Sequence, residues 1–434
     1  MSDATHDAAL RSWVGSANGS TDFPIQNLPF GVFRRHGGAA RTGVAIGDQV
    51  LDLPACADRN HLSGLDPAVI HACRQPVLNE LMALGRPASK SLRARLSHML
   101  STASTPRPEL LVPVSDTEMQ VSAAIGDYTD FYASIHHAMN VGSMFRPDNP
   151  LLPNYKYLPV GYHGRASSIV ASGTPIRRPR GQVRDDPNSA PRFAPTRMLD
   201  YELEVGFFVG AGNDLGSPVR VSEAAEHLFG ACLVNDWSAR DVQSWEYQPL
   251  GPFLAKSFAT TISPWVVTVE ALAPFRVPAA ARPVGDPAPL PHLWSEEDQA
   301  EGGVGLTLEV HLSTAQMREK GMEPVRLTHA GFASMYWTPA QMVAHHTSNG
   351  CNLRPGDLLA SGTVSGPGED QRGCLLELTW RGTRPITLPT GEQRRFLEDG
   401  DEIVFRAYAE RDGFVRIGFG ECRGRIEPAA AVTN

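Results

Sequence analysis

The stretch Leu199-Asp200-Tyr201-Glu202-Leu203-Glu204-Val205 is the part of the sequence that best predicts the fold. Its alternation of apolar and acidic residues predicts a β-strand, in which residues i and i+2 point to the same face of a sheet. Glu202 and Glu204 are therefore expected side by side. Two carboxylates held together in apolar surroundings repel each other unless one takes up a proton or a cation lies between them. Oxygen ligands of this kind suit hard divalent ions such as Ca²⁺ and Mg²⁺, and the alternative is a solvated strand face.

The composition is that of an ordinary globular protein. The chain has 434 residues, 42% of them hydrophobic and 20% charged, and this length predicts two domains. The net charge of −8 argues against a general binder of nucleic acid or anionic membranes. The six cysteines are scattered, with no pair at the spacing of a zinc site or a redox motif. The sequence has no secretory signal pattern and no run of about 18 apolar residues, so we expect a soluble, cytoplasmic protein.

The turn-forming residues predict a fold that is mainly β with α/β elements. Glycine (40 residues) and proline (35 residues) are abundant, as expected of many short strands joined by tight turns. Gly47-Asp48 between two apolar runs predicts a hairpin, and Asp66-Pro67 predicts the start of a helix. The leucine spacing in residues 75–100 predicts further helix.

We place a domain boundary near residue 118, after a break at Pro106 and Pro108, and thus predict domains 1–118 and 119–434. Strand-like runs dominate the second domain, and they cover residues 118–123, 168–171, 201–209, 265–269, 305–312, 374–380, 401–407 and 415–419. Helices are expected at residues 129–140, 222–229 and 338–349.

Two further acids lie beside aromatic or apolar residues instead of in charged loops. Asp130 follows Tyr128-Thr129, and Asp236 ends the run Leu233-Val234-Asn235. Each is alternatively the N-cap of a helix. Together with Glu202 and Glu204 these acids come from three segments, and four such acids favour one oxygen-rich cage over four separate coincidences.

His137 and Glu377 are candidates for proton transfer. If residues 130–140 form a helix, His137 shares a face with Asp130, two turns earlier. Histidine is well suited to accept a proton from water near neutral pH, although a core or surface histidine is the alternative. Glu377 lies in the apolar, strand-like run Leu375-Leu376-Glu377-Leu378 and needs a partner if it is buried there. Its alternative is an outward-facing strand residue.

The segment from Asp236 to Thr261 is dense in hydrogen-bond donors. These donors alternate with glycine and aromatic residues, as expected of a loop that lines a pocket, and they are Arg240, Gln243, Tyr247 and Lys256. Simple salt bridges to neighbouring acids are the alternative.

Long strings across nearly the whole chain resemble the fumarylacetoacetase family. In the first domain they are Asp22-Phe23-Pro24-Ile25-Gln26-Asn27-Leu28-Pro29 and Gly43-Val44-Ala45-Ile46-Gly47-Asp48-Gln49. In the second they are Ile125-Gly126-Asp127-Tyr128-Thr129-Asp130-Phe131, residues 158–168 (LPVGYHGRASS), Asn235-Asp236-Trp237-Ser238-Ala239-Arg240-Asp241 and residues 349–357 (NGCNLRPGD). The first domain is usually absent from the wider superfamily, so its presence favours the hydrolase.

The resemblance implies a small SH3-like N-terminal barrel, a mixed β-roll catalytic domain and a homodimer. It implies metal-dependent hydrolysis of the carbon–carbon bond of 4-fumarylacetoacetate to fumarate and acetoacetate, the last step of tyrosine and phenylalanine breakdown. The main cation is Ca²⁺ in the family, with Mg²⁺ or Mn²⁺ in many relatives, and the implied ligands are Asp130, Glu202, Glu204 and Asp236. A second cation, typically Mg²⁺, is associated with Asp236, Lys256 (through its main-chain oxygen) and Thr260.

The same resemblance implies roles for the remaining candidates. His137 matches the general base and Glu377 its carboxylate partner, while Arg240, Gln243 and Lys256 match oxyanion stabilisers. The implied contacts to the diketo-acid substrate are Tyr132, Arg146, Tyr162, Gln243, Tyr247 and Thr363. The chain departs from the family at Ala255 and Ala259, where glycine is commoner, and at His136, which is unusual beside His137.

Two other functions use some of the same residues. A lyase or isomerase of the superfamily, such as an oxo-acid decarboxylase, uses the acid cage without a His–Glu pair that activates water. A catalytically silent metal-binding protein needs only the cage, and it leaves Glu377 and Lys256 without a role.

Overall fold

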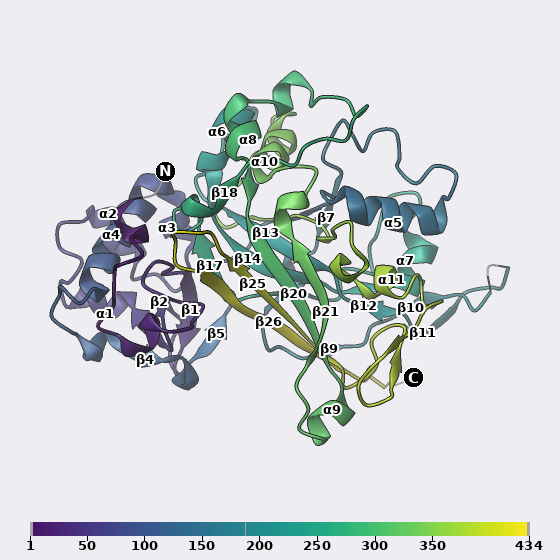
Figure 1. The fold of residues 1–434 in the computed structure, drawn as a ribbon, viewed down its shortest axis with the longest axis horizontal. Helices are drawn as coiled ribbons and strands as arrows, with labels where there is room; N and C mark the ends of the chain where they lie inside the picture. Colours follow the sequence, from purple (N-terminus) through teal and green to yellow (C-terminus); the bar gives the residue numbers. More distant parts are fainter. Residues whose placement is uncertain (1–2, 187, 432–434) are drawn as a thin grey trace.

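The computed structural model describes residues 3–186 and 188–431. Within these residues the largest element is a 13-stranded sheet whose main path runs β4-β3-β2-β1-β17-β14-β13-β22-β6-β7 (Figure 1). Off this path, β16 pairs with β14 and β8, and β5 pairs with β1. The strands are β1 (Phe30–Arg34), β2 (Arg41–Ile46), β3 (Gln49–Asp52), β4 (Leu111–Pro113), β5 (Glu118–Gln120), β6 (Tyr128–Phe131), β7 (Gly161–Gly164), β8 (Ile169–Ala171), β13 (Leu203–Val209), β14 (Leu228–Asp236), β16 (Thr260–Ile262), β17 (Trp265–Thr268) and β22 (Leu358–Ala360).

A second sheet has the strand order β21-β20-β25-β26-β9 in the described part of the chain. Its strands are β9 (Ile176–Arg177), β20 (Leu306–Ser313), β21 (Val325–Gly331), β25 (Glu402–Ala409) and β26 (Ile417–Glu427). The remaining strands form short pairs, which are β10 (Arg180–Val183) with β11 (Arg192–Pro195), β12 (Leu199–Asp200) with β15 (Ser238–Ala239), β18 (Arg276–Val277) with β19 (Gly303–Val304), and β23 (Ile386–Thr387) with β24 (Gln393–Arg394).

The α-helices are short apart from two. They are α1 (Leu53–Asp58), α2 (Pro67–Ala72), α3 (Asn79–Ala83), α4 (Gly85–Leu100), α5 (Ile135–Phe145), α6 (Val221–Ala224), α7 (Arg240–Glu246), α8 (Glu296–Glu301), α9 (Ala315–Glu319), α10 (Pro339–Thr347) and α11 (Leu375–Leu378). The mainly β architecture with α/β elements that the turn residues predicted is thus present. No helix in the described residues is long and apolar enough to span a bilayer.

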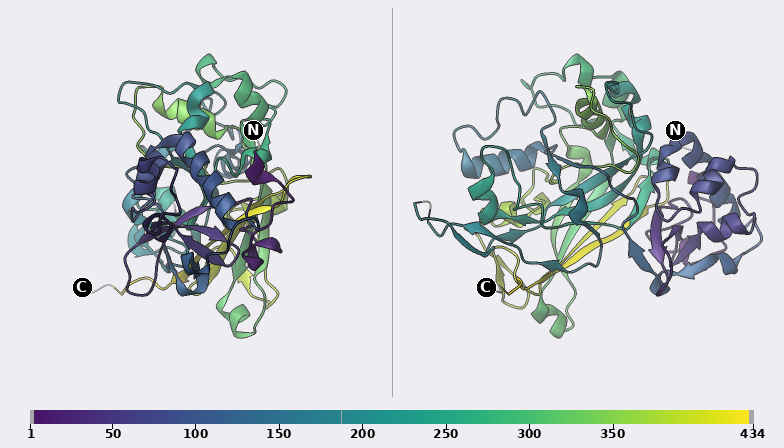
Figure 2. Two further views of the ribbon diagram at one scale, coloured as in Figure 1. Left: turned by 90° about the vertical axis from the view of Figure 1, so that its left-hand side faces the viewer. Right: turned by 180° about the vertical axis from the view of Figure 1, so that it is seen from behind.

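The N-terminal residues form a helical layer and a row of strands at one end of the molecule (Figure 2). The predicted hairpin is formed by β2 and β3, which pair from Gly43 with Asp52 to Ile46 with Gln49. Asp66 caps α2 as expected, because its Oδ1 accepts a 2.8 Å hydrogen bond from the amide of Ala68.

The row of N-terminal strands continues into the larger sheet. In β1, Phe30 pairs with Val44 on one side and with Val266 of β17 on the other. The pairing within the described residues leaves this row open and forms no closed barrel, so the SH3-like barrel is not confirmed.

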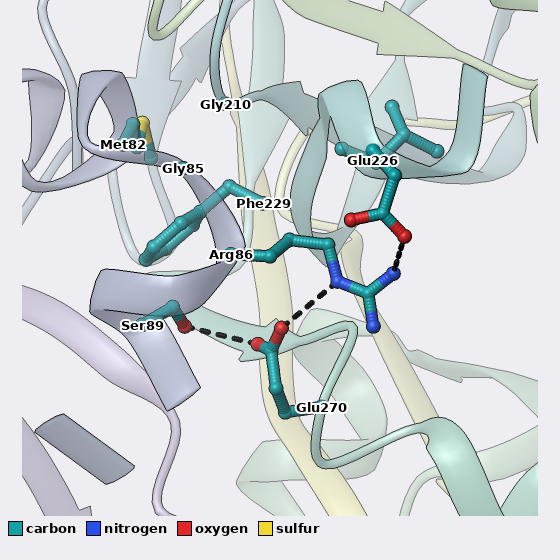
Figure 3. Close-up of a pocket in the computed structure, with 9 residues that line it drawn as sticks. Met82, Gly85, Arg86, Ser89, Gly210, Glu226, Phe229 and Glu270 are labelled. Carbon is teal, nitrogen blue, oxygen red and sulfur yellow. Dashed lines mark hydrogen bonds and ion pairs between the residues drawn. The ribbon is translucent and has the colours of Figure 1, made fainter. Parts of the chain in front are cut away.

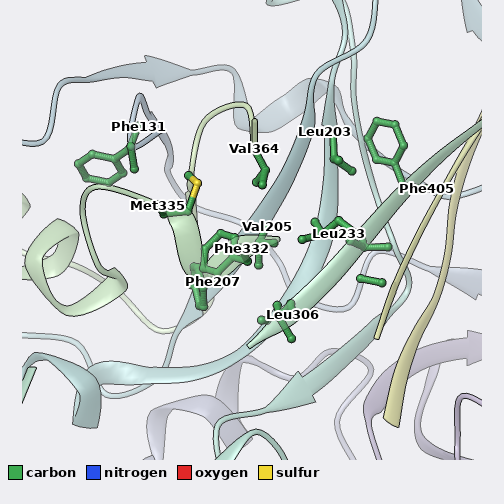
Figure 4. Close-up of a cluster of buried hydrophobic side chains, with 14 of the residues drawn as sticks. Phe131, Leu203, Val205, Phe207, Leu233, Leu306, Phe332, Met335, Val364 and Phe405 are labelled. Carbon is green, nitrogen blue, oxygen red and sulfur yellow. The ribbon is translucent and has the colours of Figure 1, made fainter. Parts of the chain in front are cut away.

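Alternation along β13 separates two cores. Leu203, Val205 and Phe207 point into a core that also contains Leu306 and Phe405 of the second sheet (Figure 4). Residues of the opposite face pack into another core with N-terminal residues, and they include Phe208 of β13, Val234 of β14, Tyr128 of β6, Phe30 of β1 and Leu92 and Leu96 of α4. Because side chains alternate in strands, Glu204, Asp236 and Asp130 share this second face with Phe208, Val234 and Tyr128.

An ion-pair cluster joins α4 to the rest of the chain beside this second core (Figure 3). Arg86 Nε lies 3.1 Å from Glu270 Oε1, and Arg86 Nη1 also pairs with Glu226. Ser89 Oγ donates a 2.9 Å hydrogen bond to the buried Glu270. The N-terminal layer is therefore held by polar contacts as well as by apolar packing.

Two of the predicted elements are wrong, and both concern the candidate site. Residues 374–380 contain the helix α11 instead of a strand, because the amides of Leu375 and Leu376 both donate to the carboxylate of Asp200. Residues 129–140 are not one helix. Asp130 lies in β6, and α5 begins only at Ile135, after its N-cap Ser134. Asp130 and His137 therefore do not share a helix face.

Candidate functional site

The structure brings together the acids that the sequence singled out. One carboxylate oxygen of each lies within 4.8 Å of the others, and the four residues are Asp130, Glu202, Glu204 and Asp236. Glu202 immediately precedes β13 and Glu204 is the second residue of that strand, while Asp236 ends β14 and Asp130 is in β6. Neither Asp130 nor Asp236 caps a helix, because Ser134 and Ala239 occupy the N-cap positions of α5 and α7. All four acids are buried.

Among the described residues, two side-chain cations and the hydroxyls of Tyr162 and Thr260 contact this acid cage. Glu202 pairs with Arg240 at 2.7 Å and also with the ammonium of Lys256. Asp236 Oδ2 lies 2.7 Å from Lys256 Nζ and accepts a 2.6 Å hydrogen bond from the hydroxyl of Tyr162. Burial opposes ionisation of Glu202, but the charges of Lys256 and Arg240 outweigh it and hold its pKa below the usual range.

Glu204 has the opposite environment. It is fully buried, and neither of its carboxylate oxygens has a hydrogen-bond partner in the described part of the chain. Burial and the negative charges of Asp130 and Asp236 raise the pKa of Glu204 well above its usual range. A buried, unpartnered carboxylate is costly, and it needs a positive charge that the described side chains do not supply.

The charge count of the cage fits one divalent cation. Its four carboxylates carry −4 when ionised. Lys256 and Arg240 offset at most two of these charges, because Arg240 is shared with Asp200, so at least two negative charges remain. The donors are all carboxylate oxygens, which hard ions such as Ca²⁺, Mg²⁺ and Mn²⁺ prefer. The residues present therefore fit the implied cation.

His137 and Glu377 form a buried pair. His137 Nδ1 lies 2.6 Å from Glu377 Oε2, so Nε2 is the ring atom left to face a reactant. Glu377 also accepts hydrogen bonds from Asn140 at 2.8 Å and from Ser365 at 2.9 Å. Burial raises the pKa of Glu377, but the charge of His137 and hydrogen bonds from His137, Asn140 and Cys374 outweigh burial and lower the pKa to about 2. The adjacent His136 is half-buried and makes no such contact among the described residues.

The predicted donors and substrate contacts are only partly gathered around the cage. Arg240 and Gln243 lie in α7, with Arg240 Nη1 3.2 Å from Gln243 Oε1. The ring of Tyr132 stands edge-on to that of His137, with 5.1 Å between the centroids. The buried Thr363 follows Gly362, whose amide donates to Asp130 Oδ1 at 3.1 Å.

Three predicted residues are less closely tied to the site. Thr260 is at the limit of hydrogen bonding, because its hydroxyl lies 3.4 Å from Asp236 Oδ1. Tyr247 is 42% exposed after the end of α7. Arg146 is exposed after α5, and its guanidinium donates to the carbonyl of Pro150 at 3.3 Å. The contacts of the described residues do not place Arg146 in the cage.

Three residues that contact the site were not predicted from the sequence, namely Asp200 and the donors Asn140 and Ser365. Asp200 is fully buried and contacts Arg240. Its position in Leu199-Asp200-Tyr201, an acid between large apolar residues, is a signal that it needs buried partners. Asn140 follows His137 by about one helical turn, so the periodicity of α5 is a signal for this residue. Ser365 has no comparable sequence signal.

Family models and curated proteins match nearly the whole chain. Residues 26–122 match a model described as the fumarylacetoacetase N-terminal region, and residues 127–427 match a model of the fumarylacetoacetate hydrolase C-terminal region. Fumarylacetoacetases from Bos taurus and Homo sapiens are each 50% identical over 420 residues, which is 94% of this chain and 97% of theirs. The Arabidopsis thaliana fumarylacetoacetase is 49% identical over 431 residues, covering 97% of this chain and 99% of its own.

This chain belongs to the fumarylacetoacetate hydrolase family. Solved structures share the fold of this chain. A fumarylacetoacetate hydrolase from Exiguobacterium antarcticum superposes with a TM-score of 0.51 at 17% identity, over 92% of this chain and 99% of its own. A probable 2-hydroxyhepta-2,4-diene-1,7-dioate isomerase from Mycobacterium abscessus gives 0.50 at 16% identity, over 93% of this chain and all of its own. Since a hydrolase and an isomerase share the fold, the reaction must be argued from the site.

Proposed function

We propose that this protein is a hydrolase that cleaves the carbon–carbon bond of 4-fumarylacetoacetate, giving fumarate and acetoacetate as the last step of tyrosine and phenylalanine breakdown. The observation that carries this proposal is the buried His137–Glu377 pair near an all-carboxylate cage. It is supported by about 50% identity to fumarylacetoacetases over almost the full length of both chains.

The His137–Glu377 pair supplies the water activation that hydrolysis needs. Glu377 holds the imidazole through Nδ1 at 2.6 Å, so Nε2 accepts a proton from water while the oxygen attacks a carbonyl of the diketone. The paired carboxylate stabilises the imidazolium that forms. Such general-base catalysis contributes about 10²–10⁴-fold in rate. A lyase or isomerase that does not add water has no need of this pair.

Cleavage also requires that negative charge on oxygen be stabilised. Hydroxide addition gives a tetrahedral oxyanion, and breaking the carbon–carbon bond moves its electron pair into the acetoacetate enolate, which then takes up a proton. A cation held by Asp130, Glu202, Glu204 and Asp236 would supply Lewis-acid stabilisation at the diketone oxygens when bound. Arg240, Gln243 and Lys256 are the proposed oxyanion donors. Arg240 Nη2 lies 2.9 Å from Asp200 but makes no hydrogen bond among the described residues.

The finer points of the proposal follow the family resemblance. The main ion is Ca²⁺, with Mg²⁺ or Mn²⁺ as substitutes, and a second ion, Mg²⁺, is placed near Asp236, Lys256 and Thr260. The proposed assembly is a homodimer and the proposed compartment is the cytoplasm. The first domain, residues 1–118, is proposed to be related to SH3-like barrels, and residues 119–434 to form the β-roll catalytic domain.

The decisive experiment follows the products of fumarylacetoacetate with the purified protein. We expect equal amounts of fumarate and acetoacetate, loss of turnover after chelation, and recovery when Ca²⁺, Mg²⁺ or Mn²⁺ is restored. Release of carbon dioxide, or an isomer without cleavage, would instead favour the lyase or isomerase. Cation binding without any turnover would favour a silent metal-binding protein.

A further inference from the structure

Asp200 connects the two halves of the candidate site. It pairs in β12 with Ser238 of β15, which places it beside Arg240, and its carboxylate is completely buried. Asp200 Oδ2 lies 3.0 Å from Arg240 Nε and 2.9 Å from Arg240 Nη2. Through Nη1 the same guanidinium contacts Glu202 of the acid cage at 2.7 Å.

The same carboxylate also holds the helix that carries Glu377. The amide of Leu375 donates to Asp200 Oδ1 at 2.8 Å, and the amide of Leu376 donates to Asp200 Oδ2 at 2.9 Å. These are the first two amides of α11, whose own N-cap residue, Cys374, provides no side-chain cap. Glu377 is the next residue, so its backbone position depends on Asp200.

Only an ionised carboxylate satisfies all these donors at once. Both oxygens of Asp200 accept from N–H groups on two sides, and an asparagine in its place would present an N–H₂ group to one of them. Buried charge-assisted hydrogen bonds are strong and geometrically specific. A shift of either Arg240 or α11 would move an oxyanion donor or the partner of His137, and catalysis is sensitive to such displacements.

We propose that Asp200 is a positioning residue that fixes Arg240 and the helix bearing Glu377 relative to each other. One buried carboxylate thereby aligns the oxyanion donor with the water-activating pair. This inference rests on the proposed hydrolase function. Asp200 is not one of the four cage acids, and it acts on the site through Arg240 and α11.

The test compares Asp200→Asn with a matched control elsewhere in the fold. Asp401 is also fully buried, accepts from Arg394 Nε at 2.8 Å and Nη2 at 3.0 Å, and accepts from the amide of Glu398 at 2.9 Å. None of these partners is a candidate site residue. Asp401→Asn therefore removes the same kind of buried interaction without touching the site.

Wild type and both variants are assayed with fumarylacetoacetate, and thermal unfolding is measured alongside. We expect Asp200→Asn to lower kcat by at least tenfold, towards the roughly 10²–10³-fold loss seen when an oxyanion donor is removed, with KM within threefold. Asp401→Asn should keep kcat within twofold. Equal kcat for the two variants would show a purely structural role and overturn the proposal.

A second variant and a second readout keep the test independent of folding and of the reaction. Asp200→Glu retains the charge opposite Arg240 but moves the carboxylate by one methylene, and it should also lose at least tenfold in kcat; wild-type kcat would overturn the proposal. Hydrogen exchange in residues 374–380 should be faster in Asp200→Asn than in Asp401→Asn, and unchanged exchange would refute the link to α11. If wild type fails to cleave the substrate, the proposed function fails while the exchange result still reports on Asp200.

Discussion

Replacing Glu204 with glutamine removes one ionisable carboxyl group from a fully buried cluster with almost no change in size. In the wild type, neither oxygen of this carboxylate has a hydrogen-bond partner among the described residues, and the other acids of the cage lie within 4.8 Å. The amide nitrogen of glutamine can donate to a neighbouring carboxylate and so exchange a repulsion for a hydrogen bond. A hydrogen bond to a charged group contributes about 1.5–3 kcal/mol, so Glu204→Gln should be more stable than wild type in chelator by a comparable amount.

The same change should weaken the response to a cation. The ionised wild-type cage has at least two negative charges that Lys256 and Arg240 do not offset, and the variant has one fewer. At a free cation concentration of about 100 times Kd, binding stabilises the wild type by about 2.7 kcal/mol. If the loss of one ligand weakens binding 100-fold, the stabilisation at that concentration falls to about 0.4 kcal/mol. The variant should therefore be more stable than wild type without the ion, and it should lose most of the stabilisation that the bound ion gives to wild type.

Urea unfolding in chelator and in a series of Ca²⁺, Mg²⁺ and Mn²⁺ concentrations measures both effects. Glu270→Gln is the matched control, because Glu270 is a buried glutamate with partners, Arg86 and Ser89. It should be less stable than wild type in chelator and should keep the full cation response. A Glu204→Gln variant that is less stable than wild type in chelator and responds equally to cations would refute the assignment of this cage as a cation site.

The remaining predictions concern the proton-transfer pair and the contact of α4. His137→Ala should lose at least about 10²-fold in kcat while keeping its cation affinity in calorimetry, and unchanged turnover would reject His137 as the base. The pKa of Glu377 is lowered to about 2, so its charge stabilises the fold above an unfolded pKa of about 4.3, and this stabilisation is lost as the pH falls towards 2. Glu377→Gln should therefore reduce the loss of stability at acid pH. An unchanged loss of stability at acid pH would contradict the pairing of Glu377 with His137. Arg86→Ala leaves the buried Glu270 with fewer partners and should cost about 1–3 kcal/mol of unfolding free energy, whereas Arg34→Ala, which breaks an exposed pair, should cost less than about 1 kcal/mol. Equal losses in the two variants would argue against the structural importance of the α4 contact.

Local pattern was sufficient for the elements whose stabilising contacts lie within a few residues. The Gly47-Asp48 hairpin and the Asp66 cap depend on such contacts, and both are present. The i and i+2 rule predicted that Glu202 and Glu204 lie together, and the structure brings both into one cage, although β13 begins between them at Leu203. In β13 the alternation of acidic and apolar residues distinguishes the two faces of the strand, although every residue of β13 is buried.

Local pattern failed where a distant residue decides the backbone conformation. Residues 374–380 read as a strand by their apolar content, but Asp200, 175 positions away from Leu375, accepts two successive amides and stabilises a helical turn. The His137–Glu377 pair joins residues 240 positions apart, and no spacing rule connects them. Family resemblance supplied that pair, and the structure provides its distance and its further donors, Asn140 and Ser365.

The N-terminal layer packs on the face of the sheet that carries three of the cage acids. Asp130, Glu204 and Asp236 lie on strands whose neighbouring same-face residues, Tyr128, Phe208 and Val234, pack against the N-terminal core. The acids are thus buried on strands whose registration is fixed by apolar packing two or four residues away, where no cage charge is involved. A cluster of repelling carboxylates cannot hold its own strands together, so this packing and the strand pairing of β13 with β14 and β22 keep them aligned. The N-terminal layer therefore contributes to the site by restraining the strands that carry it, without supplying any of the four cage acids.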